Sequence, residues 1–301
     1  MANTAALLAL MSWGLFALLG AETQSIPAFQ LLGMCFAIAA GLMFINQIAR
    51  RQWRNLRPSL TPSEWLIGTV GLFGFHFAYF MALKYAPPLH VSLISYLWPL
   101  LLSVLVASQQ HKIKALCAGI VGFAGVSLAL FEQPPHTDAM PWQTTHLVGY
   151  ALALSCAVIW AGYSWFFASR QNKVTDIGWL SLLVAVLAFA CHSAFETSHW
   201  QLTNYQWLLV FLLGLGPVGG AFYLWDYGMK HGNRSMLASL CFFTPLLSTA
   251  VLVLAGKAVW SGQVMVAVGL VLAGALINNV TRMHWRAAKL YTLQQLNKKR
   301  A

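Results

Sequence analysis

The segment 76–80 places an imidazole and a phenol in the middle of an apolar run. His76, Tyr79 and Phe80 are spaced i, i+3 and i+4, so their side chains would share one face of a helix. An ionisable side chain inside such a run is costly and usually faces a cavity or a polar partner. The spacing therefore predicts that His76 and Tyr79 line a cavity. The alternative is a neutral His76 imidazole that hydrogen-bonds a neighbouring helix.

A second polar and aromatic group, formed by Ser95, Tyr96, Trp98 and Pro99, lies in the next apolar run. Pro99 has no backbone N–H and so frees a carbonyl one turn earlier, near Ser95. A freed carbonyl is tolerated inside a membrane where it lines water or is covered by protein, and it is able to accept a hydrogen bond from an ammonium group. Pro245 occupies the corresponding place in a later run. The alternative for both prolines is a simple kink between packed helices.

Two tryptophans, Trp98 and Trp160, lie deep within their apolar runs, and Tyr163 follows Trp160 by three residues. Buried aromatic faces can stack on an aromatic ligand, or attract an ammonium group by about 0.5–2 kcal/mol. These residue types therefore predict a substrate site with aromatic walls. Packing alone is an equally good interpretation of each ring.

The run 206–227 carries a glycine cluster that ends at Gly220, and an acid, Asp226, four residues before Lys230. Clustered glycines let helices approach closely or bend, which indicates a moving element around Gly220. The i, i+4 spacing predicts a surface ion pair between Asp226 and Lys230. A role for Asp226 in gating is the alternative.

The composition indicates that lipid, rather than water, surrounds much of the chain. Of the 301 residues, 59% are hydrophobic and 8% are charged, whereas soluble domains carry about 25% charged residues. The net charge of +11 comes from small basic groups between apolar runs, which favours membrane topology over nucleic-acid binding. The five cysteines all lie inside apolar runs without metal-ligand spacing, and so predict neither disulfides nor a metal site. No cofactor is expected.

The apolar runs predict an all-α integral membrane protein of ten transmembrane helices. They cover approximately residues 4–20, 27–47, 65–84, 90–108, 114–131, 147–168, 177–195, 206–227, 236–255 and 264–281. With ten spans, all of the 18 lysines and arginines except Lys84 and Lys257 fall on the side of both termini. Because cytoplasmic loops carry the Lys and Arg excess, both termini are predicted to be cytoplasmic.

An internal repeat divides the chain. Gly74, Lys84 and the segment 99–101 recur 146 residues later as Gly220, Lys230 and the segment 245–247. Five helices per copy is an odd number, so the second copy would cross the membrane upside down. Inverted repeats of this kind are a common transporter plan, with a central cavity at the repeat interface. The predicted parts are a first repeat (1–131), an outer linker (132–146), a second repeat (147–281) and a basic cytoplasmic tail (282–301).

These motifs resemble the drug/metabolite transporter superfamily in its EamA-type branch, which has two five-helix repeats. The residues that carry the resemblance are the segments 13–14, 82–86, 99–101 and 245–247 and the late glycines of each half. The segment Tyr96-Leu97-Trp98-Pro99 is further similar to the YddG-type aromatic amino-acid exporters of that branch. The second half departs from this pattern, with Phe243-Thr244-Pro245 where the first half has Leu97-Trp98-Pro99.

The resemblance implies a multi-pass protein of the bacterial inner membrane that exports aromatic and other apolar amino acids such as Phe, Tyr, Trp and Met. Since acidic residues lie mostly in or beside loops, the expected mechanism is alternating access by uncoupled facilitated diffusion, in a monomer surrounded by lipid. Export of another small metabolite or a drug, coupled to protons, is the alternative. A membrane enzyme is not expected, because the sequence has no HExxH motif and no deep pair of carboxylates.

Overall fold

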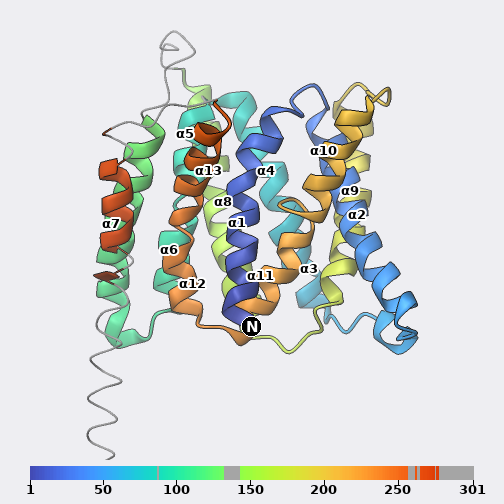
Figure 1. Ribbon diagram of the computed structural model, residues 1–301, viewed down its shortest axis with the longest axis horizontal. Helices are drawn as coiled ribbons and strands as arrows, with labels where there is room; N and C mark the ends of the chain where they lie inside the picture. The colour runs from blue at the N-terminus through green and yellow to red at the C-terminus, as the bar shows by residue number, and fades with distance from the viewer. Residues whose placement is uncertain (87, 132–142, 257–261, 263–264, 275, 278–301) are drawn as a thin grey trace, which may run out of the picture.

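The computed structural model describes residues 1–86, 88–131, 143–256, 262, 265–274 and 276–277. The described residues form helices and connecting turns without β-strands, and the helices lie side by side in one bundle (Figure 1). Six helical segments are long and apolar enough to cross a membrane, or seven if one bent pair counts as a single span. They are Ala2–Gly20, Ala28–Ala49, Pro62–Tyr85, Thr145–Ala168, Asp176–Phe195 and Asn204–His231, with Arg234–Leu240 and Phe243–Leu254 as the bent pair. The count of ten spans stays a prediction.

Each predicted run coincides with helical residues in the described part of the chain. The first half contains α1 (Ala2–Ala21), α2 (Ala28–Ala49), α3 (Pro62–Thr69), the π-helix η2 (Val70–Gly74), α4 (Phe75–Tyr85), α5 (Pro88–Ser95), α6 (Trp98–Val106) and α7 (Lys112–Phe131). The short 3₁₀ helices η1 (Trp53–Leu56) and η3 (Gln109–His111) lie in its connections. The second half contains α8 (Thr145–Ala168), α9 (Asp176–Phe195), α10 (Asn204–Leu215), α11 (Gly220–His231), α12 (Arg234–Leu240) and α13 (Phe243–Leu254). A further apolar helix covers Met265–Gly274.

Four of the predicted runs are interrupted rather than continuous, and the interruptions recur at nearly the repeat offset. The π-helix η2 corresponds to the break at 216–219 between α10 and α11, and the start of α6 corresponds to the start of α13. Pro99 lies in the first turn of α6, where a proline needs no helical N–H donor. Breaks of this kind depart from regular α-helical hydrogen bonding and often occur at functional sites.

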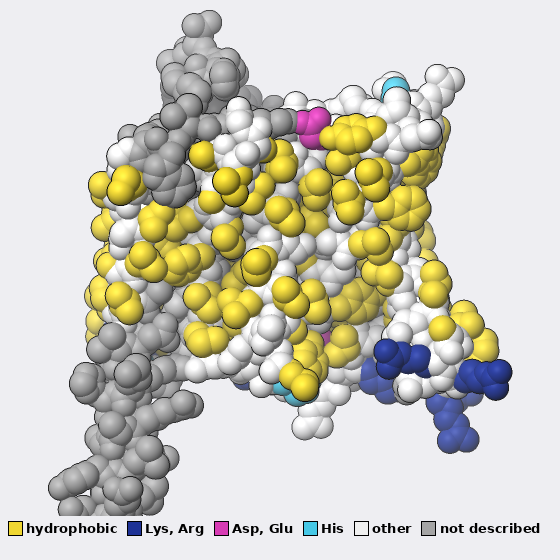
Figure 2. Space-filling model, viewed as in Figure 1, with side chains coloured by type: hydrophobic (Ala, Val, Ile, Leu, Met, Phe, Trp, Pro, Cys, Tyr) yellow, Lys and Arg dark blue, Asp and Glu magenta, His cyan; other side chains and the backbone are white. Residues whose placement is uncertain are grey.

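The surface supports a membrane position for the bundle. Large apolar side chains such as Leu8, Met11 and Val158 are more than half exposed, because they face outward from the helices. Figure 2 shows apolar side chains over the middle of one face, with Lys and Arg gathered at one edge. The edge is here called the basic edge, and it includes the exposed arginines of segment 50–57. Most of the predicted linker (132–142) and the predicted tail (282–301) lie outside the described residues, as does Lys257.

The helices α2 and α9, which lie about one repeat offset apart in the sequence, pack along each other. At the start of α9, Asp176 accepts a hydrogen bond at 2.9 Å from the backbone N–H of Ser59, which lies between η1 and α3. At the other end Glu196 accepts from the backbone N–H groups of Phe29 at 3.0 Å and Gln30 at 3.2 Å. These N–H groups open α2 and would otherwise lack helical partners. Glu196 Oε2 also lies 2.9 Å from His192 Nδ1.

Replacing Glu196 with alanine should lower the thermal unfolding temperature of the purified protein in detergent. A lost N-terminal cap costs about 0.5–2 kcal/mol, and here the same change removes the hydrogen-bond partner of His192. Glu196→Gln keeps an acceptor for the α2 N–H groups and should lie between the alanine variant and the wild type. Equal unfolding temperatures for wild type and Glu196→Ala would contradict the capping role.

Candidate functional site

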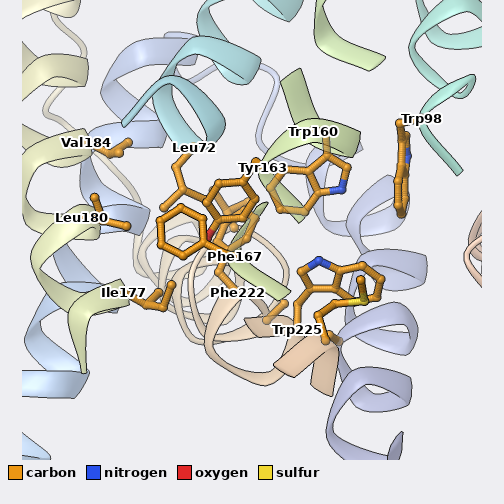
Figure 3. Packing of buried hydrophobic residues seen from close by; sticks show 14 of the residues in the cluster. Leu72, Trp98, Trp160, Tyr163, Phe167, Ile177, Leu180, Val184, Phe222 and Trp225 are labelled. Carbon is orange, nitrogen blue, oxygen red and sulfur yellow. The ribbon is translucent and has the colours of Figure 1, made fainter. Parts of the chain in front are cut away.

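Four tryptophans from four different helices meet in the centre of the bundle. Trp160 of α8 lies 5.7 Å from Trp13 of α1 and 6.2 Å from Trp98 of α6, measured between ring centroids. Trp225 of α11 lies 5.4 Å from Trp13 and 6.1 Å from Trp98. Phe222, one turn before Trp225, lies 5.5 Å from Trp160. We call these five rings the aromatic cluster (Figure 3, where Trp98, Trp160, Trp225 and Phe222 are labelled).

Two of the indoles are held in place by hydrogen bonds between helices. Trp13 Nε1 donates to the Pro217 carbonyl at 3.0 Å, which lies in the break between α10 and α11. Trp225 Nε1 donates to Ser164 Oγ at 3.1 Å. A buried indole N–H needs a partner, so these bonds fix the ring orientations. The cluster is therefore a set of buried or half-buried rings, two of which have fixed orientations.

His76 lies beside the aromatic cluster. The predicted alternative placed its hydrogen-bond partner on a neighbouring helix, but the partner lies in the same span as His76. Its Nδ1 lies 2.6 Å from the Leu72 carbonyl of its own span, within the π-helix η2. Its ring is 6.2 Å from Phe222, 5.2 Å from Phe75 and 5.6 Å from Phe36. The imidazole thus hydrogen-bonds within its span, while neighbouring helices surround it with aromatic rings.

Tyr79 extends this surface away from the tryptophans. Its ring stacks on Phe75 at 6.3 Å, and Phe75 in turn lies 5.8 Å from Trp160. The Tyr79 hydroxyl lies 3.3 Å from Ser92 Oγ of α5. Ser95 is buried at the end of the same helix. Hydroxyl groups and aromatic rings are therefore neighbours on one side of the cluster.

The rings of Trp160 and Tyr163 stack on each other, with centroids 5.2 Å apart, and their contact with a substrate stays a prediction. Tyr163 in turn packs 4.9 Å from Phe167, and all three side chains are buried. The Tyr163 hydroxyl has no hydrogen-bond partner within the described part of the chain. A buried hydroxyl without a partner is costly, so this position favours the binding of a polar molecule such as water.

Asp226 and Lys230 form the predicted ion pair, at 2.6 Å, but the prediction that it lies on the surface is wrong. The two side chains are only 1% and 5% exposed. Lys230 Nζ also donates to the Asn172 carbonyl at 3.1 Å, and Asp226 Oδ1 has no hydrogen-bond partner among the described residues. The pair is buried because α11 packs against α1 and α8, a contact that sequence spacing does not reveal.

Gly220 begins α11 directly after the break in its span. A Cβ atom there would collide with the carbonyl oxygen of Leu215 at the end of α10. The backbone of the break therefore passes too close to α10 for a side chain at this position, and the moving element expected around Gly220 stays a prediction.

The structure brings most of the predicted site residues together. Trp98, Trp160 and Tyr163 belong to or adjoin the aromatic cluster, and Phe75 links them to His76 and Tyr79. Tyr96 instead packs against a separate cluster around Phe242 and Leu246. The buried prolines Pro99 and Pro245 lie near the helix starts of α6 and α13.

Sequence reasoning did not assign Phe36, Phe75, Phe222 and Trp225 to the site. Two of them carry a signal that was available. Phe222 and Trp225 lie 146 residues after His76 and Tyr79, so the repeat offset maps one pair onto the other. Phe36 and Phe75 have no comparable signal, because their role depends on helix packing.

Comparison with known proteins places the chain in a family. The sequence model of the EamA-like transporter family matches residues 1–131 and 147–280. The chain belongs to the EamA-like transporter family. The family name and the apolar helices identify it as a multi-pass membrane transporter.

Similar proteins include several that carry the name aromatic amino acid exporter YddG. The one from Ancylobacter novellus is 36% identical over 275 residues, which are 89% of this chain and 93% of that protein. The one from Escherichia coli K12 is 24% identical over 246 residues, 76% of this chain and 82% of that protein. A solved crystal structure matches with a TM-score of 0.83 at 35% identity, covering 93% of this chain and 97% of the other.

Proposed function

We propose that this transporter exports aromatic and other apolar amino acids, such as Phe, Tyr, Trp and Met, across the bacterial inner membrane. The observation that carries the proposal is the aromatic cluster, in which rings from both halves of the chain meet at the bundle centre. Relatives named as aromatic amino acid exporters support the same cargo.

The proposed site has an aromatic wall and a polar end. The side chain of the amino acid packs on Trp98, Trp160 and Tyr163, where each ring pair contributes about 0.5–1.5 kcal/mol beyond burial. The ammonium group lies toward Tyr79, Ser95 and the interrupted backbone between α5 and α6, whose freed polar groups suit a zwitterion. His76 and Pro245 complete the proposed lining, and Tyr96 contributes from the neighbouring cluster.

The architecture proposed for transport is ten helices in two inverted repeats, 1–131 and 147–281, with 132–146 as linker and 282–301 as tail. Reciprocal contacts support it, because α1 packs on α11 and α13 while its repeat mate α8 packs on their mates α4 and α6. The matching interruptions support it as well. Both termini are proposed to be cytoplasmic, from the basic edge, and the transporter is proposed to act as a monomer in lipid.

Alternating access requires an element that bends and a contact that opens. The break before Gly220 is the proposed bend. The contact is the buried pair of Asp226 and Lys230, which joins α11 to the carbonyl of Asn172 after α8. Opening a path on this side would separate these groups.

Transport is proposed to be uncoupled, although Asp226 favours a second candidate. A buried carboxylate with one free oxygen is the kind of group that proton-coupled transporters use. Export of another metabolite or drug, driven by protons, is therefore the alternative function.

Uptake of labelled phenylalanine into proteoliposomes tests the proposal. The wild type should equilibrate phenylalanine to equal concentrations inside and outside, and empty liposomes should remain impermeable on that time scale. Imposing a pH gradient should change neither the rate nor the final level. Accumulation driven by the pH gradient would support the coupled alternative, and absence of phenylalanine transport would overturn the proposed cargo.

A further inference from the structure

An open cavity of about 420 Å³ lies at the basic edge, between the start of α3 and the segment that follows α8. Hydroxyl, amide and charged side chains line it: Ser59, Thr61, Glu64, Ser169, Arg170 and Asn172. It is separate from the aromatic cluster, and the proposed export mechanism uses only one of its residues, Asn172, through the backbone carbonyl that accepts from Lys230.

Two opposite charges face each other across the cavity. Glu64 Oε1 lies 4.0 Å from Arg170 Nε, while Glu64 Oε2 accepts from the Thr61 backbone N–H at 2.8 Å. This second oxygen is used by the capping box that begins α3, which holds the carboxylate in place. The Glu64 side chain is 8% exposed and that of Arg170 is 44% exposed.

Arg170 is positioned as well. Its guanidinium carbon lies 4.2 Å above the Phe166 ring centroid, a cation–π contact that orients the side chain while leaving its N–H groups available. At 4.0 Å, the Glu64 and Arg170 groups do not form a close hydrogen bond. Each can therefore bind a further charged group of opposite sign.

Asn172 connects this cavity to the buried ion pair of Asp226 and Lys230. Its backbone carbonyl accepts from Lys230 Nζ at 3.1 Å, and Lys230 pairs with Asp226. Its side-chain oxygen Oδ1 is buried and has no hydrogen-bond partner in the part that the structure describes. Because this oxygen is buried, it is closed off from the open cavity and is not part of the proposed ligand site.

We propose that this cavity binds the ammonium and carboxylate groups of a free amino acid, without selecting its side chain. Glu64 receives the ammonium group, and Arg170 binds the carboxylate. Because the cavity is open, the amino-acid side chain extends into water. The assignment of an amino acid, rather than another zwitterion such as the headgroup of phosphatidylethanolamine, rests on the proposed function.

Equilibrium dialysis of labelled glycine against the purified protein in detergent tests this inference. Glycine carries both charges and has no side chain that could use the aromatic cluster. The wild type should bind it saturably, and Glu64→Gln and Arg170→Gln should each weaken binding by about tenfold or more. Glu64→Gln is a conservative test, because glutamine also completes a capping box.

Arg54→Gln is the matched control, since it removes an exposed arginine of η1 outside the cavity, and it should bind glycine like the wild type. Glycerophosphoethanolamine should compete more weakly than phenylalanine; stronger competition would assign the cavity to a lipid headgroup. Glycine affinity unchanged in both Glu64→Gln and Arg170→Gln, or no glycine binding to the wild type, would overturn the proposal. Phenylalanine transport, measured separately, decides the proposed function, so the two can fail independently.

Discussion

Replacing Trp160 with alanine is expected to reduce phenylalanine transport by about tenfold or more, corresponding to at least about 1.4 kcal/mol. Trp160 contacts Trp13, Trp98, Tyr163 and Phe222, so its removal takes away the centre of the proposed substrate wall. Each aromatic pair contributes about 0.5–1.5 kcal/mol beyond its buried area. Initial rates of labelled phenylalanine uptake into proteoliposomes measure the effect.

Trp165→Ala is the matched control for Trp160→Ala. Trp165 lies on the same helix, α8, and is 50% exposed on its outer surface, so its loss should leave the transport rate close to that of the wild type. Trp160→Phe keeps a ring and should retain much of the activity. Comparable thermal unfolding temperatures exclude misfolding as the cause. Unchanged transport in Trp98→Ala and in His76→Ala would remove the proposed site.

Replacing Lys230 with methionine is expected to destabilise the folded protein by about 3–5 kcal/mol. The Asp226 carboxylate is 1% exposed, so without Lys230 its charge would be buried and uncompensated. The thermal unfolding temperature of the purified protein in detergent should fall clearly. Adding Asp226→Asn to Lys230→Met removes the orphaned charge and should recover most of the loss, since a buried ion pair contributes little net stability.

Lys84→Met is the control for Lys230→Met. Lys84 is the repeat mate of Lys230 but is exposed, so its replacement should change the unfolding temperature little. The two lysines differ because Asp226, the partner of Lys230, corresponds to Phe80 in the first half. Lys84 therefore has no carboxylate four residues before it. A fall for Lys84→Met equal to that for Lys230→Met would contradict a specific role for the buried pair.

The sequence by itself determined the helical membrane class, the family and the aromatic character of the centre. These depend on local properties: the length of apolar runs, the low fraction of charged residues and the placement of Lys and Arg. The repeat offset also carries a signal for Phe222 and Trp225, because it maps them onto His76 and Tyr79, although neither was predicted as a site residue. The spacing of Trp160 and Tyr163 places both rings on one face of a helix.

Only the tertiary structure decided which side chains meet and which are buried. The i, i+4 spacing of Asp226 and Lys230 is the same for a surface pair and a buried pair, and the packing of α11 made the difference. The partner of His76 is the Leu72 carbonyl, four residues earlier in the same span, and the π-helix that contains Leu72 is not marked by the sequence pattern. The position of Phe36 beside His76, and the cavity between Glu64 and Arg170, arise from segments far apart in the chain. Helix packing sets such contacts, and no spacing within one helix encodes them.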